Sequence, residues 1–211
     1  SFEEVVHELN FNDDQVTMAN VLYETNLWTD IFGDDFDFSF KINGNFSSGG
    51  SSITNGVVFV NGSRPGNQKV IDLALSQLGN SGGQPYCNDY GFSGRVEWCS
   101  VFTWWCYNNS DCNNVFPSKV DVNCAYCPSM VSYWKSVGKF GDKNYRDLAQ
   151  GDCIYFDYEN DGTSDHVGLV IGRDEEWVYT VEGNSNDMVA ERKYKLDSNI
   201  ILGYGLVDPG N

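Results

Sequence analysis

Lysine and arginine are scarce in this sequence. Its 211 residues hold 13 of them against 30 aspartates and glutamates, which gives a formal net charge of −17 at pH 7. A surface this acidic repels nucleic-acid phosphates and anionic lipid headgroups. We therefore expect no nucleic-acid partner and no adhesion to membranes by charge. A cationic partner or bound metal ions would complement such a surface better.

Long apolar runs are absent as well. The longest, such as VVFV at 57–60, fall far short of the roughly 20 residues that a membrane-spanning helix needs. We therefore expect no membrane segment in this chain. The first residues, SFEE at 1–4, lack the basic region followed by an apolar one that marks a signal peptide. The native start is expected to have been removed or to lie upstream.

Hydrophobic residues, by contrast, are plentiful. They make up 41% of the chain, with 13 Phe, 12 Tyr and 6 Trp among them. A disordered chain does not carry such a supply, so we expect a folded core. The length suits one domain with an appendage, or at most two small domains.

Three regions are expected along the chain. Residues 1–45 carry helical patterns at 2–9 and 13–25 and form an N-terminal helical segment. Residues 46–66 are rich in Gly, Ser and Asn, which is typical of a flexible linker. For the apolar stretch within this region, a strand is the alternative interpretation. Residues 67–211 form the main domain.

The hydrophobic period changes within this main domain. Helical patterns come first, including one that starts near Cys99 and one beyond Pro128. Short β-branched or aromatic segments separated by turn residues follow from Cys153 to Leu206. Helices followed by antiparallel strands predict an α+β fold, in which the N-terminal helices pack on a C-terminal antiparallel sheet of about five to six strands.

Seven cysteines are present, an odd number. They are Cys87, Cys99, Cys106, Cys112, Cys124, Cys127 and Cys153. Six of them can pair as three disulfides and leave one free thiol, which is the interpretation we favour. A zinc site built from Cys106, Cys112, Cys124 and Cys127, and a fully reduced state, are the alternatives.

Histidine is scarce too, and this narrows the candidate chemistry. Only His7 and His166 occur, and His166 is the one that lies in the main domain. Cys99 is expected in the first turn of a buried helix, where the amide ends lower its pKa and favour the thiolate. A histidine that opens a strand can take the thiol proton and return it to a leaving amine. Glu182 and Asn184 are two apart, so on a strand they would share a face and one could orient the imidazole.

These segments together resemble the CHAP domain, the cysteine, histidine-dependent amidohydrolase/peptidase module of bacterial and phage cell-wall hydrolases. The resemblance runs over most of the stretch from about 67 to 208. Its pieces are the helix at 70–78, Glu97-Trp98-Cys99, Gly151-Asp152, Asp165-His166-Val167-Gly168, Val181-Glu182-Gly183-Asn184 and Gly203-Tyr204-Gly205. The related NlpC-type peptidases more usually have histidine as the orienting residue, so the carboxylate of Glu182 favours CHAP.

The resemblance implies a papain-like fold, with Cys99 as nucleophile, His166 as base, Glu182 as orienting residue and Asn184 as a fourth polar member. It also implies cleavage of an amide in peptidoglycan, either the N-acetylmuramoyl–L-alanine bond or a peptide bond of the stem or cross-bridge. Two alternatives stay open: a related amidase acting on a substrate outside the wall, and a catalytically silent wall-binding module. No cofactor is expected for the chemistry itself.

Aromatic residues surround the expected nucleophile in the sequence. Trp98 and Tyr86 are the ones we expect to wall a groove and contact the substrate, although aromatic side chains beside such a helix are more often core.

An acidic stretch, residues 157–165, has a spacing similar to that of a calcium loop. Oxygen ligands are expected from Asp157, Glu159, Asp161, Thr163 and Asp165. The twelfth position of the pattern is Gly168, which cannot supply the usual bidentate carboxylate, and an acidic hairpin turn is the alternative. Bound calcium would have a structural role, bracing the strand that begins at His166.

The wall hydrolase interpretation places the protein outside the bacterial cell or at its surface, and we expect a monomer. The chain would then be part of a longer protein, such as a multidomain hydrolase of phage release or conjugative transfer.

Overall fold

The computed structural model describes residues 51–54, 57–60 and 62–210, which all belong to one compact unit, 47–211. The expected helices at 2–9 and 13–25 lie outside the described residues. Strands β1 (Ser51–Thr54) and β2 (Val57–Val60) pair antiparallel as a two-stranded sheet. The apolar stretch at 57–60, where a strand was one expectation, thus forms β2.

Helices make up the first half of the main domain. They are α4 (Gln68–Leu75), α5 (Gln84–Tyr90), α6 (Cys99–Asn108), the short 3-10 helix η1 (Asn113–Val115) and α7 (Cys127–Ser136). Helix α4 is amphipathic and buries Val70, Ile71 and Ala74. Helix α6 is instead buried on almost every side, which explains why its sequence shows no clear apolar stripe.

Six strands make up the second half. They are β3 (Phe140–Asp142), β4 (Cys153–Phe156), β5 (His166–Arg173), β6 (Trp177–Glu182), β7 (Ala190–Lys195) and β8 (Ile201–Gly205). They form one open sheet in the order β3-β8-β4-β5-β6-β7, in which all neighbours are antiparallel. The α+β fold and the six-stranded antiparallel sheet expected from the sequence are confirmed.

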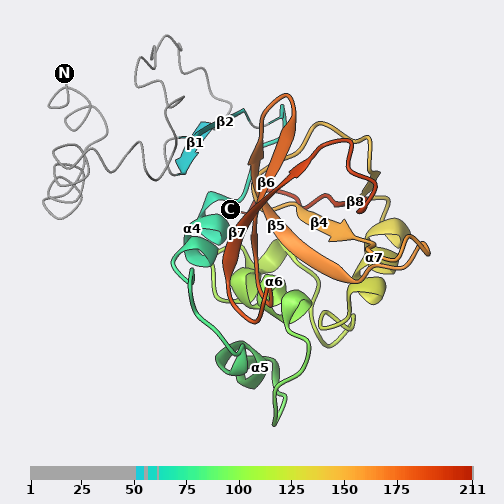
Figure 1. Cartoon of the computed structure of the whole chain (residues 1–211). Helices are drawn as coiled ribbons and strands as arrows, with labels where there is room; N and C mark the ends of the chain where they lie inside the picture. The colour runs from blue at the N-terminus through green and yellow to red at the C-terminus, as the bar shows by residue number, and fades with distance from the viewer. Residues whose placement is uncertain (1–50, 55–56, 61, 211) are drawn as a thin grey trace, which may run out of the picture. The chain divides into compact units, whose positions relative to one another are not determined.

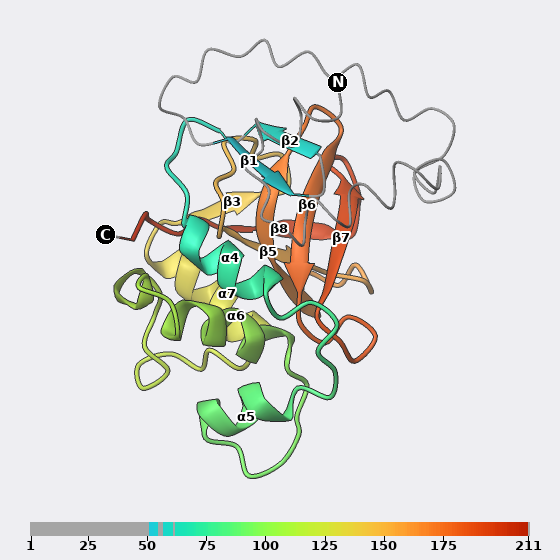
Figure 2. The same ribbon diagram turned by 90° about the vertical axis from the view of Figure 1, so that its left-hand side faces the viewer.

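The helices lie against one face of this sheet. Figures 1 and 2 show α6 next to β5, with α5 on the side of α6 that faces away from the sheet. The largest apolar cluster fills the space between, with Phe102 and Val101 of α6 close to Val167 and Leu169 of β5 in a single core. A second cluster, which includes Val170 and Val178, covers the opposite face. Both faces of β5 are therefore buried, which fixes the strand that begins at His166.

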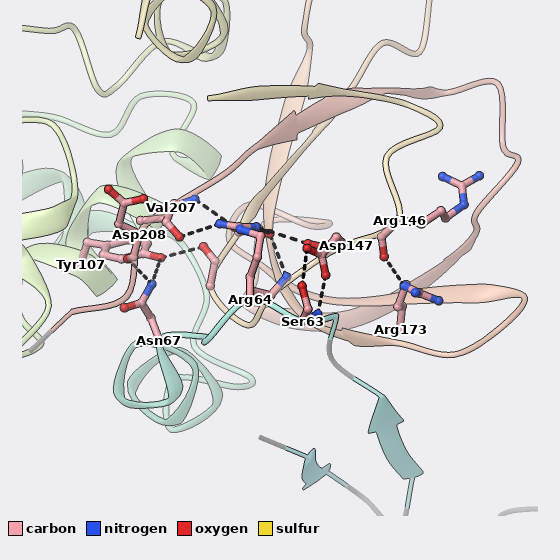
Figure 3. Close-up of polar contacts among 12 residues, drawn as sticks. Ser63, Arg64, Asn67, Tyr107, Arg146, Asp147, Arg173, Val207 and Asp208 are labelled. Carbon is pink, nitrogen blue, oxygen red and sulfur yellow. Dashed lines mark hydrogen bonds and ion pairs between the residues drawn. The ribbon is translucent and has the colours of Figure 1, made fainter. Parts of the chain in front are cut away.

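The segment before α4 is bound to the end of the chain. Figure 3 shows Arg64 between the backbone of Val207 and Asp147. It also shows Asn67 beside Tyr107 and Asp208. Arg64 forms an ion pair of 2.6 Å with the buried Asp152 and donates to the carbonyl of Val207 at 2.9 Å. Arg64 thus connects the segment before α4 to Asp152 and Val207.

Asp152 is the centre of this connection. Besides Arg64, its carboxylate accepts the backbone N–H groups of Ala149 and Val207, at 2.8 and 2.9 Å. The Gly151-Asp152 pair singled out in the sequence therefore has a structural place, since it joins three separate parts of the chain. No helix in the described part of the chain is long and apolar enough to cross a membrane.

Candidate active site

Cys99 is the first residue of α6, and its side chain is 6% exposed. The N–H groups of a helix's first turn have no partner within the helix, so they place partial positive charge beside this thiol. A hydrogen bond from the Cys127 thiol, together with the interaction with His166, lowers the pKa of Cys99 well below its ordinary value, against the opposing effect of burial. The lowered pKa favours the thiolate form of Cys99.

His166 and Glu182 form the second part of the site. His166 is the first residue of β5 and Glu182 the last residue of β6, and the two strands are neighbours. The imidazole Nε2 lies 2.9 Å from Glu182 Oε2, and both side chains are buried. A carboxylate at Nε2 favours the proton on that nitrogen, and the same imidazole interacts with the Cys99 thiol.

The charge of His166 follows from these two neighbours. Burial opposes a charged imidazole, but hydrogen bonds and charge interactions with Cys99 and Glu182 outweigh it and raise the pKa of His166 to about 9. The pKa of Cys99 moves in the opposite direction. The two shifts describe one coupled system, and both favour the imidazolium–thiolate form of the pair.

Glu182 is itself held in place by its own strand. Thr180 Oγ1 donates to Glu182 Oε1 at 2.6 Å, and Thr180 is fully buried. Residues two apart on a strand share a face, so β6 presents both groups together. One carboxylate oxygen is thereby bonded to Thr180 and the other to His166.

The loop after β6 fastens the segment that precedes Cys99. Arg95 forms an ion pair of 2.6 Å with Asp187, and Trp98 Nε1 lies 3.4 Å from the same carboxylate. Asn184 donates to the Glu97 carboxylate. These contacts hold residues 95–98, which precede Cys99, against the loop that follows β6.

Asn184 does not share a strand face with Glu182, so that expectation is wrong. Strand β6 ends at Glu182, and Asn184 adopts a left-handed conformation with φ of 58°. Its side chain consequently points toward Glu97. In the described structure Asn184 supports the loop before the nucleophile.

Trp98 and Tyr86, expected to contact substrate, are buried in the core. Trp98 is fully buried and Tyr86 is 2% exposed, and their rings stack with centroids 5.4 Å apart. The structure thus places both side chains in the core, and the substrate contact expected from them stays a prediction. Both side chains belong to the apolar core cluster. Trp98 is the residue directly before α6.

The acidic loop 157–165 bonds mainly to its own backbone. Asp157 accepts the N–H groups of Asp161 and Gly162, at 3.1 and 2.7 Å, and Asp165 accepts that of Tyr158 at 2.6 Å. No group of three or more metal-ligating side chains converges within the part of the chain that the structure describes. The loop residues as placed form a hydrogen-bonded turn. The bond from Tyr158 to Asp165 braces the start of β5.

All seven cysteines are free, buried thiols in the structure. The three expected disulfides are therefore absent from it, and so is the four-cysteine zinc cage among the described residues. Each thiol belongs to the apolar core cluster, where cysteine behaves as a small hydrophobic side chain. The spacing of cysteines in the sequence does not distinguish this use from a disulfide framework.

Three residues that lie beside Cys99, His166 or Glu182 were not expected from the sequence. Cys127 is the first residue of α7, and its Sγ lies 3.7 Å from that of Cys99. Tyr158 is 51% exposed and its ring lies over His166, with centroids 6.2 Å apart. Thr180 is the third. The position of Thr180 two residues before Glu182 was the one signal that could have identified it.

No known family model matches the chain, and no curated protein gives a significant match.

Proposed function

We propose that this protein is a cysteine-dependent amide hydrolase of the CHAP type, with a papain-like fold, that cleaves peptidoglycan. The observation that carries the proposal is the arrangement of three groups from three elements. A thiol at the start of α6 interacts with His166, whose second ring nitrogen is bonded to the buried carboxylate of Glu182. Nucleophile, base and orienting group in this order are what acyl transfer needs.

The thiolate of Cys99 attacks the amide carbonyl carbon. The oxyanion that forms is held by backbone N–H groups at the start of α6, among them that of Cys99 itself, since the first N–H groups of a helix have no partner within it. His166, as imidazolium, protonates the leaving amine. The neutral imidazole then takes a proton from water, which attacks the thioester and releases the acyl product.

Glu182 keeps the imidazole in the productive orientation through this cycle. Its Oε2 accepts from Nε2 and stabilises the positive charge, while Thr180 restrains the other oxygen. Asp165 and Tyr158 brace the start of β5, which positions His166. Structural calcium in this loop stays a prediction, and no step of the mechanism depends on it.

The choice of peptidoglycan rests on the resemblance to CHAP domains. The motif pieces occur in the CHAP order, and a carboxylate occupies the place of the orienting residue. The bonds in question are the N-acetylmuramoyl–L-alanine amide and the peptide bonds of the stem and cross-bridge. A wall substrate places the protein outside the cell or at its surface.

The test is release of new free amines from purified sacculi by the wild-type protein. The proposal expects release that requires an intact Cys99 thiol. A protein whose Cys99 reacts rapidly with a small alkylating reagent but that releases no amine would be a hydrolase for another amide. One that does neither would have no catalytic thiol.

A further inference from the structure

Two helices bring their first residues together at the candidate nucleophile. Cys99 begins α6 and Cys127 begins α7, and their sulfur atoms lie 3.7 Å apart. Figure 2 shows α6 and α7 on the same side of the sheet. Both thiols are buried, with exposed fractions of 6% and 5%.

We propose that Cys99 and Cys127 form an oxidisable dithiol site, which a hydroperoxide converts to a disulfide and a small-molecule dithiol restores. The formation of the disulfide rests on the two thiols alone. Its consequence for activity rests on the proposed function, because a Cys99 sulfur bonded to Cys127 cannot attack an amide. The site is thereby a reversible control on the nucleophile.

Formation of a disulfide requires one thiol that is oxidised first and a second that then attacks it, and the two thiols differ in this way. The hydrogen bond to Cys127 and the contact with His166 lower the pKa of Cys99 and favour its thiolate, the form that reacts with peroxides. The same hydrogen bond raises the pKa of Cys127, which therefore stays a neutral thiol. One sulfur is thus the group that is oxidised first, and the other lies in place to resolve it.

The chemistry balances in two steps. The Cys99 thiolate attacks one oxygen of hydrogen peroxide, the O–O bond breaks, and sulfenic acid and water form once a proton is taken up. The Cys127 sulfur then attacks the sulfenic sulfur, the S–S bond forms and the S–O bond breaks. The hydroxyl leaves as water with the proton of Cys127. Two thiols are oxidised, one peroxide is reduced and two waters are produced.

The geometric change that this requires is small. A disulfide has a sulfur–sulfur distance of about 2.05 Å, and the thiols start at 3.7 Å. Rotation of either side chain about its Cα–Cβ bond moves its sulfur without moving the helix backbone. The other cysteines are placed differently: Cys124, for example, donates its thiol to the carbonyl of Pro117.

The experiment treats the wild-type chain with hydrogen peroxide, blocks remaining thiols under denaturing conditions and maps the peptides by mass spectrometry. We expect a peptide pair that joins Cys99 to Cys127 with the loss of two hydrogens, and its disappearance after dithiothreitol. Cys112→Ser is the matched control, since Cys112 lies outside the site, and it should give the same linked pair. Oxidation of Cys99 beyond sulfenic acid with Cys127 still free, or a link between other cysteines, would overturn the proposal.

Hydrolysis of sacculi is measured on the same samples. Wild-type activity should be lost with the appearance of the linked peptide and return with dithiothreitol. In Cys127→Ser, peroxide should leave Cys99 as sulfinic or sulfonic acid, and dithiothreitol should not restore activity. A linked peptide without hydrolytic activity before oxidation would count against the proposed function but not against the dithiol. If Cys127→Ser does not fold, the wild-type peptide map still decides.

Discussion

The side chain of Glu182 passes directly over Gly168. A Cβ atom at position 168 would lie 2.7 Å from Glu182 Cγ, closer than such atoms approach in real proteins. Gly168 is two residues after His166 on β5, so both lie on the same face of the strand. The missing side chain at 168 is what lets the carboxylate cross to the imidazole.

Gly168→Ala should therefore impair hydrolysis and leave the fold in place. The added methyl group displaces Glu182 from His166, and misplacement of a catalytic group by about 1 Å costs on the order of 100-fold in rate. Steady-state hydrolysis of sacculi, with circular dichroism as the check of folding, measures this. Gly94→Ala is the matched control, because a Cβ at position 94 meets no atom within 4 Å. Equal activity of the two variants would contradict the role given to Gly168.

The pH profile of hydrolysis should have a broad plateau around neutral pH. The acid limb reflects formation of the Cys99 thiolate, whose pKa is lowered, so activity persists below the range of an ordinary thiol. The alkaline limb reflects loss of the proton from His166, whose pKa is raised to about 9, so activity falls as pH rises through that value. Both limbs belong to the coupled pair. An increase in rate up to pH 10 would contradict the imidazolium–thiolate assignment.

Glu182→Gln keeps the size of the side chain and a hydrogen-bonding oxygen but removes the negative charge. Because the interaction with Glu182 contributes to the raised pKa of His166, the alkaline limb should move to lower pH and the maximal rate should fall. The pH dependence of the alkylation rate of Cys99 reports the same shift without a substrate. An unchanged alkaline limb would show that Glu182 does not act on the imidazole.

Asp152→Ala should lower the free energy of unfolding by about 3 kcal/mol, the low end for breaking a buried ion pair. The change removes the ion-pair partner of Arg64 and the acceptor of the Val207 backbone N–H. Chemical denaturation measures the effect. Asp111→Ala is the control, since its ion pair with Lys69 lies in solvent and its loss should change stability little. Equal stability of both variants would show that Asp152 does not stabilise the contact between the segment before α4 and Val207.

The elements that carry the candidate site were largely predictable from the sequence. A helix was expected to start near Cys99, and strands were expected at His166 and before Glu182, and the structure places all three there. The hydrophobic pattern predicts elements of this kind because the residues of each element lie in one dominant environment, such as the core. Short elements were missed, among them α5, which has seven residues, and β3, which has three.

The contacts between elements could not be predicted in the same way. Cys127 is 28 positions from Cys99, and only the tertiary fold, which brings the first residues of α6 and α7 together, places the sulfurs close to each other. The burial of Trp98 likewise depends on close approach of Gly83 and Gly183, where a Cβ would lie 2.4 and 2.8 Å from its indole ring. Asn184 left the expected face because its backbone is left-handed, which residue spacing does not reveal.

The most direct test of the central claim is digestion of purified peptidoglycan sacculi by the wild type and by Cys99→Ala, followed by mass spectrometry of the soluble fragments. Cys112→Ser controls for loss of a thiol outside the site. The account predicts fragments from the wild type and the control that Cys99→Ala does not release. A free stem N-terminus among them would identify an amidase, and a newly freed amine or carboxyl group within the stem or cross-bridge an endopeptidase. Equal release by Cys99→Ala, or no fragments from any folded protein, would contradict the assignment of Cys99 as the nucleophile of a wall hydrolase.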